Sequence, residues 1–247
     1  MLSVIVKTKN SGDFLCETLE SVSSVDEIIL VDENSSDDTL DIAKNYKAQV
    51  IYVSSDDIKS GLNQAVLEAK NDWIMVLNDN EIVPQKLLLE VNKYIENPKK
   101  NKNALLINQK TFYLDNEIKA AHKRILRVFK KGCAEFKNSY SIALKCTKGK
   151  VHNLNKNNQN KNGCILRQYK SVFLNFNQML EKGILRFKNC ERKAPNFLKL
   201  IEKFISLYIL KGAIFNGKIG IIYVVNAIIQ DYIVECAIYE RAQKDDI

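Results

Sequence analysis

Short apolar runs alternate with longer amphipathic stretches through the first hundred residues of the chain. The runs are rich in β-branched residues, as buried parallel strands are, and they cover residues 2–6, 27–31, 49–53 and 73–77. The stretches between and after them have helical periodicity and cover residues 13–22, 36–46, 58–70 and 84–95. Strands and helices that alternate at this spacing predict βαβ units. We therefore expect an α/β fold with a Rossmann-like, mostly parallel sheet and helices on both faces.

The rest of the chain has a less regular pattern. Apolar runs that predict antiparallel strands cover residues 104–109, 111–114 and 125–129, and a polar, low-complexity loop covers residues 153–162. Helical patterns follow at residues 171–188, 196–210 and 219–242. We therefore divide the chain into a nucleotide-binding part (1–97), a mixed part with strands and a polar loop (98–165) and a basic helical C-terminal part (166–247).

One helix start has a specific signal. Ser36 is a residue type that caps helix N-termini, and Asp37 and Asp38 follow it, where the helix dipole favours acidic side chains. The pattern predicts that the second helix begins at Ser36 and that the two aspartates serve the helix start.

Charge is distributed unevenly along the chain. Residues 1–97 carry 8 Lys and no Arg against 18 acidic residues, a net charge of −10, whereas residues 98–247 carry a net charge of +18. This asymmetry predicts that the basic part faces an anionic partner. A phosphorylated acceptor, phospholipid head groups and nucleic acid are all compatible with charge alone.

Cysteine spacing and the first residues favour the cytoplasm. The six cysteines include no C-x-x-C pair, so a zinc ribbon or a redox motif is not indicated. Lys7 and Lys9 directly follow the first apolar run, which is not the pattern of a secretory signal. We expect a cytoplasmic protein.

Polar and acidic residues follow the predicted strands where ligands bind in open parallel sheets, at the carboxyl ends. Four motifs in this order resemble the family-2 inverting glycosyltransferases, and most closely the small bacterial type that adds sugars to the lipopolysaccharide core. They read SVIVKTKN at 3–10, VDENSSDDT at 31–39, NQAVLEAKNDW at 63–73 and LNDNE at 77–81. The segment RILRVFKKG at 124–132 and the helical tail extend the resemblance over most of the chain.

The resemblance implies a GT-A fold, a nucleotide-sugar donor that is UDP-linked, and a glycolipid or oligosaccharide acceptor in lipopolysaccharide, lipooligosaccharide or capsule synthesis. It places six residues at the nucleotide: Thr8, Asn10, Asp32, Glu33, Lys59 and Asn63. It places Asn78, Asp79 and Asn80 at the donor diphosphate and its divalent metal, Mn²⁺ or Mg²⁺. Arg124 and Arg127 fall on the acceptor side.

Three departures from the family pattern change the expected chemistry. Two asparagines, Asn78 and Asn80, replace the outer acids of the metal-binding motif, and Leu62 replaces a basic residue, which leaves Lys59 as the nearest substitute. Asn153, in Val151-His152-Asn153, stands where the family has its catalytic glutamate, and an amide does not accept a proton at neutral pH. Asp79, Glu81 and Asn153 are the candidate catalytic residues.

Several alternatives stay open. For the diphosphate, either Asp79 and Glu81 supply a shifted metal site, or basic residues neutralise its charge without a metal. The protein is an active transferase, a degenerate relative that binds or scaffolds, or a basic peripheral membrane protein. Nucleic acid is not expected, because the basic run 122–131 alternates like a half-buried strand and no nucleic-acid-binding motif accompanies it.

The C-terminal helices are apolar and have lysines beside them. Polar residues interrupt the last helix, so a transmembrane span is not expected, and two alternatives remain. The helices bind an anionic membrane peripherally on the inner face of the plasma membrane, or their apolar faces pack on the sheet.

Overall fold

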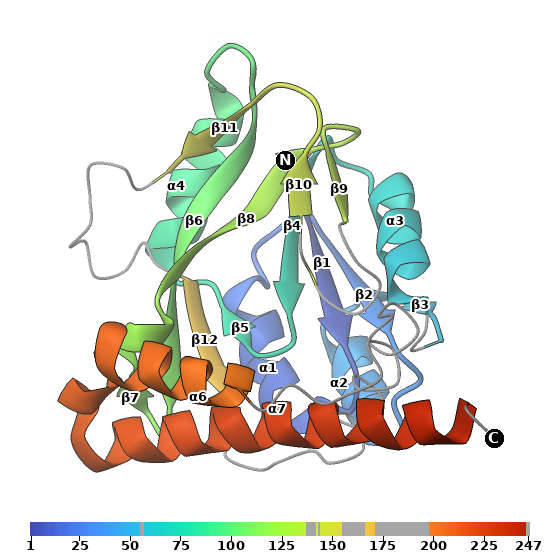
Figure 1. Ribbon diagram of the computed structural model, residues 1–247. Helices are drawn as coiled ribbons and strands as arrows, with labels where there is room; N and C mark the ends of the chain where they lie inside the picture. Colours follow the sequence, from blue (N-terminus) through green and yellow to red (C-terminus); the bar gives the residue numbers. More distant parts are fainter. Residues whose placement is uncertain (55–56, 137–141, 143, 155–165, 171–197, 246–247) are drawn as a thin grey trace. The chain divides into compact units, whose positions relative to one another are not determined.

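The computed structural model describes residues 1–54, 57–136, 142, 144–154, 166–170 and 198–245 (Figure 1). The chain divides into two compact units, which we describe separately. The first consists of Met1–Gln109 and Lys123–Gln168, and the second of Lys110–His122 and Tyr169–Ile247. The predicted helix at 171–188 and most of the predicted polar loop at 153–162 lie outside the described residues.

The first unit is built on a parallel sheet in the order β3-β2-β1-β4. Its strands are β1 (Leu2–Thr8), β2 (Glu27–Asp32), β3 (Gln49–Tyr52) and β4 (Trp73–Asn78). Its helices are α1 (Gly12–Ser21), α2 (Thr39–Asn45), α3 (Ile58–Glu68) and α4 (Gln85–Glu96). The predicted α/β class, with a mostly parallel sheet covered by helices, is confirmed.

Mostly antiparallel strands extend this sheet beyond β4. The long strand β6 (Lys102–Tyr113) and β8 (Lys123–Lys130) pair with each other, and β8 pairs with β4. The shorter strands are β5 (Glu81–Ile82), β7 (Asn116–Glu117), β11 (Lys150–Asn153) and β12 (Leu166–Lys170), while β9 (Ala134–Phe136) and β10 (Leu144–Cys146) form a separate pair. The antiparallel strands predicted at 104–109 and 125–129 are therefore present.

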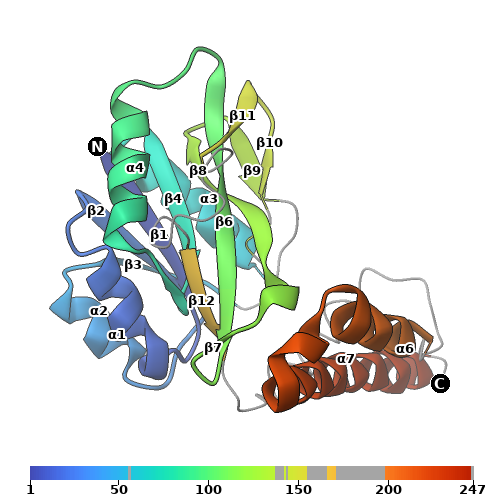
Figure 2. The same ribbon diagram turned by 90° about the vertical axis from the view of Figure 1, so that its left-hand side faces the viewer.

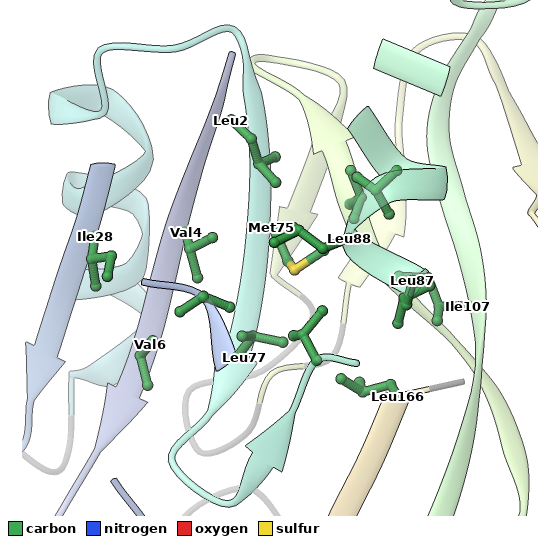
Figure 3. Close-up of a cluster of buried hydrophobic side chains, with 14 of the residues drawn as sticks. Leu2, Val4, Val6, Ile28, Met75, Leu77, Leu87, Leu88, Ile107 and Leu166 are labelled. Carbon is green, nitrogen blue, oxygen red and sulfur yellow. The ribbon is translucent and has the colours of Figure 1, made fainter. Parts of the chain in front are cut away.

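Two apolar clusters, one on each face of the sheet, form the core of the first unit. Val4, Val6 and Met75 face the side on which Leu87 and Leu88 of α4 pack (Figure 3). The alternate residues of the same strands face α3; they include Ile5, Ile29, Ile74 and Val76, which cluster with Ile58, Leu62 and Ala65. Both faces of β1 and β4 are buried, which is why these strands read as continuous apolar runs.

The second helix begins later than predicted, at Thr39, so the assignment of Ser36 as its N-cap is wrong. The backbone N–H of Ser36 instead donates to Oδ1 of Asn10, 2.8 Å away. Asp37 accepts from the N–H groups of Gly12 and Thr39, at 3.1 Å each. Residues 35–38 are therefore held by the loop after β1, and this contact competes with the local helix signal.

The second unit contains two adjacent helical segments in its described part (Figure 2). One runs through α6 (Leu198–Ile205) and the π-helical η2 (Ser206–Leu210), and the other through η3 (Ala213–Asn216) and α7 (Gly217–Asp245). Leu207, Ala213, Tyr223 and Val224 form its apolar cluster with Tyr113 and Ile118. The stretch Ala213–Tyr239 contains an 18-residue window with a mean hydropathy of 1.6 and is long and apolar enough to cross a membrane, by length and composition alone.

Helix α3 lies against the sheet at a glycine, and this contact generates a prediction. A Cβ at Gly61 would overlap Cγ1 of Val53 and lie 3.0 Å from Cγ1 of Val31. Glycine to alanine in a helix ordinarily stabilises by about 0.5–1 kcal/mol. Here we expect Gly61→Ala to lower the free energy of unfolding by about 1–3 kcal/mol, because overpacking outweighs helix propensity. Urea denaturation measures it, with the exposed Ser60→Ala on the same helix as the control; stabilisation by Gly61→Ala would contradict the packing.

Candidate functional site

The carboxyl ends of β1, β2 and β4 meet at one edge of the sheet. Lys7 and Thr8 end β1, and they are in register with Asn78 of β4 and Asp32 of β2, respectively. The chain leaves β1 towards β2 and β3 and returns on the other side of β1 as β4. The edge between β1 and β4 is therefore the switch point at which ligands bind in open α/β sheets.

Asp32 is fully buried at the end of β2, and the following turn holds its carboxylate. The backbone N–H of Ser35 donates to Oδ2 at 2.9 Å, and the Ser35 hydroxyl donates to Oδ1 at 2.5 Å. Asn10, which has a left-handed backbone (φ 48°), donates its N–H to Oγ of Ser35 at 2.9 Å. The loops after β1 and β2 are thus joined, and Asp32 has a fixed orientation at the edge.

Thr8 is buried beside Asp32. Its hydroxyl has no hydrogen-bond partner among the described residues. A buried hydroxyl at a ligand edge is able to bind a ligand oxygen or water.

Asp79 follows β4 and contacts the start of α1. The Ser11 hydroxyl donates to Oδ2 of Asp79, and the N–H of Ser11 donates to Oγ1 of Thr39 at 2.8 Å. Burial raises the pKa of the Asp79 carboxyl, although the hydrogen bond from Ser11 and the charge of Lys7 oppose the rise. The side chain therefore carries a partly desolvated negative charge at the switch point.

Lys7 supplies positive charge between the two acidic strand ends. Its ammonium forms an ion pair with Oε1 of Glu33, and its charge also acts on Asp79. The N–H of Glu33 donates to the carbonyl of Thr8 at 3.0 Å, which fixes Glu33 next to β1. Lys7 thus places a positive charge at the switch point.

Glu81 is fully buried and accepts hydrogen bonds from three residues. Arg127 donates from Nη2 to Oε1 at 2.8 Å and from Nε to Oε2 at 3.2 Å. Gln109 donates to Oε1 at 2.6 Å, and Asn78 donates from its backbone N–H at 3.0 Å and from its amide at 3.1 Å. The carboxylate is saturated, and its role is to hold the turn after β4 in place.

Arg127 reaches Glu81 because strand β8 has an irregular register. Leu105 pairs with Val128 and Leu106 with Leu126, so Arg127 is the extra residue of a bulge. Bulges commonly redirect a side chain next to a site. Arg127 is only 4% exposed and also donates from Nη1 to the carbonyl of Ile142 at 3.0 Å, whereas Arg124 on the same strand is exposed.

The remaining predicted residues lie on other elements. Lys59 and Asn63 are exposed on α3, and Asn80 is half-buried in the turn after β4. Asn153 ends β11 and pairs with Leu106 of β6, so the strands β6 and β8 lie between it and β4. The structure brings Thr8, Asn10, Asp32, Glu33, Asn78 and Asp79 together at one edge, and it does not bring Asn153 to them.

The side chains at this edge do not make a ready metal site. No group of three His, Cys, Asp or Glu side chains suitable for a metal ion occurs in the part of the chain that the structure describes. The Asn78 amide donates to Glu81, and Glu81 is saturated, so Asp79 is the one carboxylate of the 78–81 turn that does not bind Arg127. An aspartate at 78 would face the Glu81 carboxylate directly. The donor set therefore does not fit a divalent ion held by two acids.

Two residues of the site had no role assigned from the sequence. Lys7 is the one charged residue of β1 (Leu2–Thr8), and a charge within a buried strand was the available signal. Ser11 stands at the N-cap of α1 but makes no side-chain cap bond, because its hydroxyl donates to Asp79 instead. That partner lies 68 residues away and has no local signal in the sequence.

Comparison with known proteins identifies the family to which this chain belongs. The family model "Glycosyl transferase family 2" matches residues 3–151, which include the strand ends described above. The chain belongs to glycosyl transferase family 2. An uncharacterized glycosyltransferase of Rickettsia prowazekii is 32% identical over 97 residues, which cover 36% of this chain and 31% of the relative. The chain spans about a third or less of the length of the curated relatives that it matches.

A Staphylococcus aureus protein is similar in both sequence and structure. Poly(ribitol-phosphate) beta-N-acetylglucosaminyltransferase TarS is 28% identical over 120 residues, which cover 44% of this chain and 21% of TarS. The crystal structure of TarS 1–349 in complex with UDP-GlcNAc has a TM-score of 0.51 at 16% identity, covering 98% of this chain and 82% of that one. The family-2 chain thus has a GT-A-like fold, as the resemblance implied.

The two arginines of strand β8 should differ sharply in their effect on stability. We expect Arg127→Met to lower the free energy of unfolding by about 3–5 kcal/mol, because it leaves the Glu81 carboxylate buried without its cation. Arg124→Met, at an exposed position of the same strand, should change it by less than about 0.5 kcal/mol. Chemical denaturation of both variants measures this, and equal effects would show that Glu81 does not depend on Arg127.

The raised pKa of Asp79 predicts how the stability of the fold depends on pH. The pKa of Asp79 in the folded protein lies above the ordinary value of 3.8. Ionisation of Asp79 therefore lowers the free energy of unfolding as the pH rises from the unfolded-state pKa to the folded-state pKa. Above the folded-state pKa this loss of stability is constant. We expect Asp79→Asn to be more stable than the wild type at neutral pH, by a margin that shrinks in acid. Thermal denaturation at several pH values tests this. A stability margin of Asp79→Asn that does not change with pH would contradict the raised pKa.

Proposed function

We propose that this protein transfers a sugar from a nucleotide-sugar donor, UDP-linked, to a hydroxyl group of its acceptor. The observation that carries the proposal is the convergence of Lys7, Asp32 and Asp79 at the switch point of a family-2 chain. A carboxylate accepts from the donor groups of a nucleoside or a sugar, and a cation attracts a diphosphate, so these three side chains are chemically suited to a nucleotide-sugar.

The proposed roles follow from where each residue lies. Asp32, in its fixed orientation, accepts from the base or ribose, with Thr8, Asn10 and Glu33 beside it. Lys59 and Asn63 contribute from the exposed face of α3, which lies after β3. Lys7 compensates diphosphate charge, and Asp79 accepts from a hydroxyl of the transferred sugar. Arg124 is proposed on the acceptor side, whereas Arg127 positions the turn after β4 through Glu81.

The reaction requires a base. A bond forms between the acceptor oxygen and the anomeric carbon, the bond from that carbon to the diphosphate oxygen breaks, and the acceptor proton must go to a carboxylate or imidazole. The amide of Asn153 does not accept it. Donor binding without transfer is therefore a second candidate function, favoured by the amide at this position and by its separation from β4.

The acceptor is proposed to be an anionic glycolipid or polysaccharide of the cell envelope, as in lipopolysaccharide, lipooligosaccharide or capsule synthesis, reached from the cytoplasmic face of the membrane. Two observations support this. Residues 98–247 carry a net charge of +18, which favours an acceptor with phosphate or other acidic groups. The similar protein TarS acts, by its name, on poly(ribitol-phosphate), which is a phosphate polymer.

Donor binding tests the proposal directly. We expect UDP and one or more UDP-sugars to raise the melting temperature of the wild type, because a ligand that binds only the folded state stabilises it. Asp32→Asn should weaken UDP binding by about tenfold or more, roughly 1.4 kcal/mol, because the carboxylate that accepts from the base or ribose is lost. The exposed Asp41→Asn on α2 should bind like the wild type. Calorimetry that finds no UDP binding to the wild type would overturn the site.

Release of UDP then separates the two candidate functions. A panel of UDP-sugars, incubated with an envelope extract as a source of acceptor, with and without Mn²⁺, should yield UDP and a labelled product if the protein is a transferase. UDP binding without any release or product would favour the binding-only function. Since one Asp79 carboxylate is a weak metal site, Mn²⁺ should improve UDP binding by less than about tenfold.

A further inference from the structure

The turn between the two helical segments of the second unit exposes large apolar side chains. Phe215 is 89% exposed, Leu210 79% and Ile214 47%. We call these three residues the apolar tip. They come from the end of η2 and from η3, so they project where one helical segment reverses into the other.

The tip rests on a packed base. Ala213 is fully buried in the cluster with Leu207, Tyr223 and Val224. The turn needs Gly212, whose backbone is left-handed (φ 76°), and Gly220, where a Cβ would overlap the carbonyl oxygen of Ala213. Because Ala213 is anchored, the fold holds its neighbours Ile214 and Phe215 outward. Their apolar surface stays in contact with water in the monomer, which is unfavourable.

Strand β7 also anchors this turn within the same unit. The amide of Asn216 donates to the carbonyl of Glu117 at 2.8 Å, and the amide of Asn226 donates to the hydroxyl of Tyr113 at 2.8 Å. Tyr113 in turn packs edge-on against Tyr223, with ring centroids 5.8 Å apart. These hydrogen bonds and ring contacts therefore fix the position of the turn that carries the apolar tip.

The exposed apolar surface continues along α7. Ile221, Ile222 and Val225 are 43–46% exposed and lie one turn or less from one another on the helix. Ile229 and Tyr232 follow at the next turns with exposures of 40% and 48%. One side of α7 near the tip is thus apolar and uncovered, while Tyr223 and Val224 on its other side are buried.

Two lysines flank the tip. They are Lys211 and Lys218, which are exposed, and the sequence from residue 203 to residue 230 contains no Asp or Glu. The third lysine of this stretch, Lys203, forms an ion pair with Asp231 and also donates to the carbonyl of Ala227 at 3.3 Å. The tip therefore combines apolar side chains with two lysines that no acidic residue of the same stretch balances.

We propose that the apolar tip docks on the surface of an anionic lipid bilayer. Phe215, Leu210 and Ile214 enter the boundary between head groups and acyl chains, and Lys211 and Lys218 contact anionic head groups. A second copy of the chain fits less well, because a symmetric contact through the tip would bring four lysines together with no acid from the stretch between them. This docking is independent of sugar transfer.

The tip is proposed to lie on the membrane and not to lead a helix across it. The apolar stretch Ala213–Tyr239 includes Lys218 near its start, and Asp231 within it pairs with Lys203 of α6. A span would place that ion pair and part of α6 at membrane depth, where charged groups are expensive. A surface position leaves them on the aqueous side.

Vesicle sedimentation with the full chain tests the proposal. We expect binding to vesicles of phosphatidylcholine with phosphatidylglycerol, weaker binding to phosphatidylcholine alone, and partial release at high salt because salt screens the lysines. The double variant Leu210→Ser, Phe215→Ser should lower the partition coefficient by about tenfold or more. Its control is Leu67→Ser, Leu89→Ser, which removes two apolar side chains of similar exposure, 79% and 60%, from α3 and α4.

A second pair of variants tests the charges. Lys211→Gln with Lys218→Gln should lower partitioning to anionic vesicles by about 30-fold and leave binding to neutral vesicles almost unchanged. Lys86→Gln with Lys93→Gln, at exposed positions of α4, should have no effect. Circular dichroism of all variants establishes that they fold.

Four results would overturn the docking proposal. The first is that the wild type binds neither kind of vesicle, and the second is that the folded tip variant binds as well as the wild type. The third is that the bound protein resists extraction at pH 11, which indicates a membrane span. The fourth is that the wild type self-associates without lipid and the tip variant does not. The vesicles contain no donor or acceptor, so failure here is distinct from failure of the proposed transferase function.

Discussion

The buried ion pair between Glu81 and Arg127 is the interaction on which the candidate site depends. Glu81 belongs to the turn after the parallel strand β4, and Arg127 to the antiparallel strand β8 beside it. A carboxylate without exposure is tolerable only with a cation and a full set of donors, which Arg127, Gln109 and Asn78 supply. Because these donors come from three strands, the pair fixes the position of Asp79 relative to Lys7 and Asp32.

The parallel half of the fold was predictable from the sequence, because its physics is local. β1, β2 and β4 are buried on both faces, so each reads as a continuous apolar run, and the helices between them read as amphipathic. The strand ends were predictable for the same reason, since parallel strands align their carboxyl ends. The start of α2 was not, because Asn10, 26 residues away, holds Ser36.

The chemistry of the site was only partly predictable. Asp32 and Asp79 could be placed from the strand ends, but the sequence did not distinguish the two acids of the 78–81 turn. That distinction rests on Gln109 and Arg127, which are 28 and 46 residues from Glu81. Arg127 reaches it through a bulge that no local pattern marks. Arg124 and Arg127 looked alike in sequence, yet one is exposed and the other is buried.

The replacement of acids by asparagines has a physical logic in this structure. Desolvation already disfavours the negative charge of Asp79, and a second carboxylate at 78 would stand against Glu81 in the same buried turn. Asn78 instead uses its amide to satisfy Glu81, so a position that would otherwise supply metal-binding charge contributes to the rigidity of the edge. Lys7, which the Glu33 carboxylate holds at the switch point, then supplies a positive charge that acts on Asp79. The proposed recognition of a diphosphate at this edge therefore depends on Lys7, a cation built into strand β1.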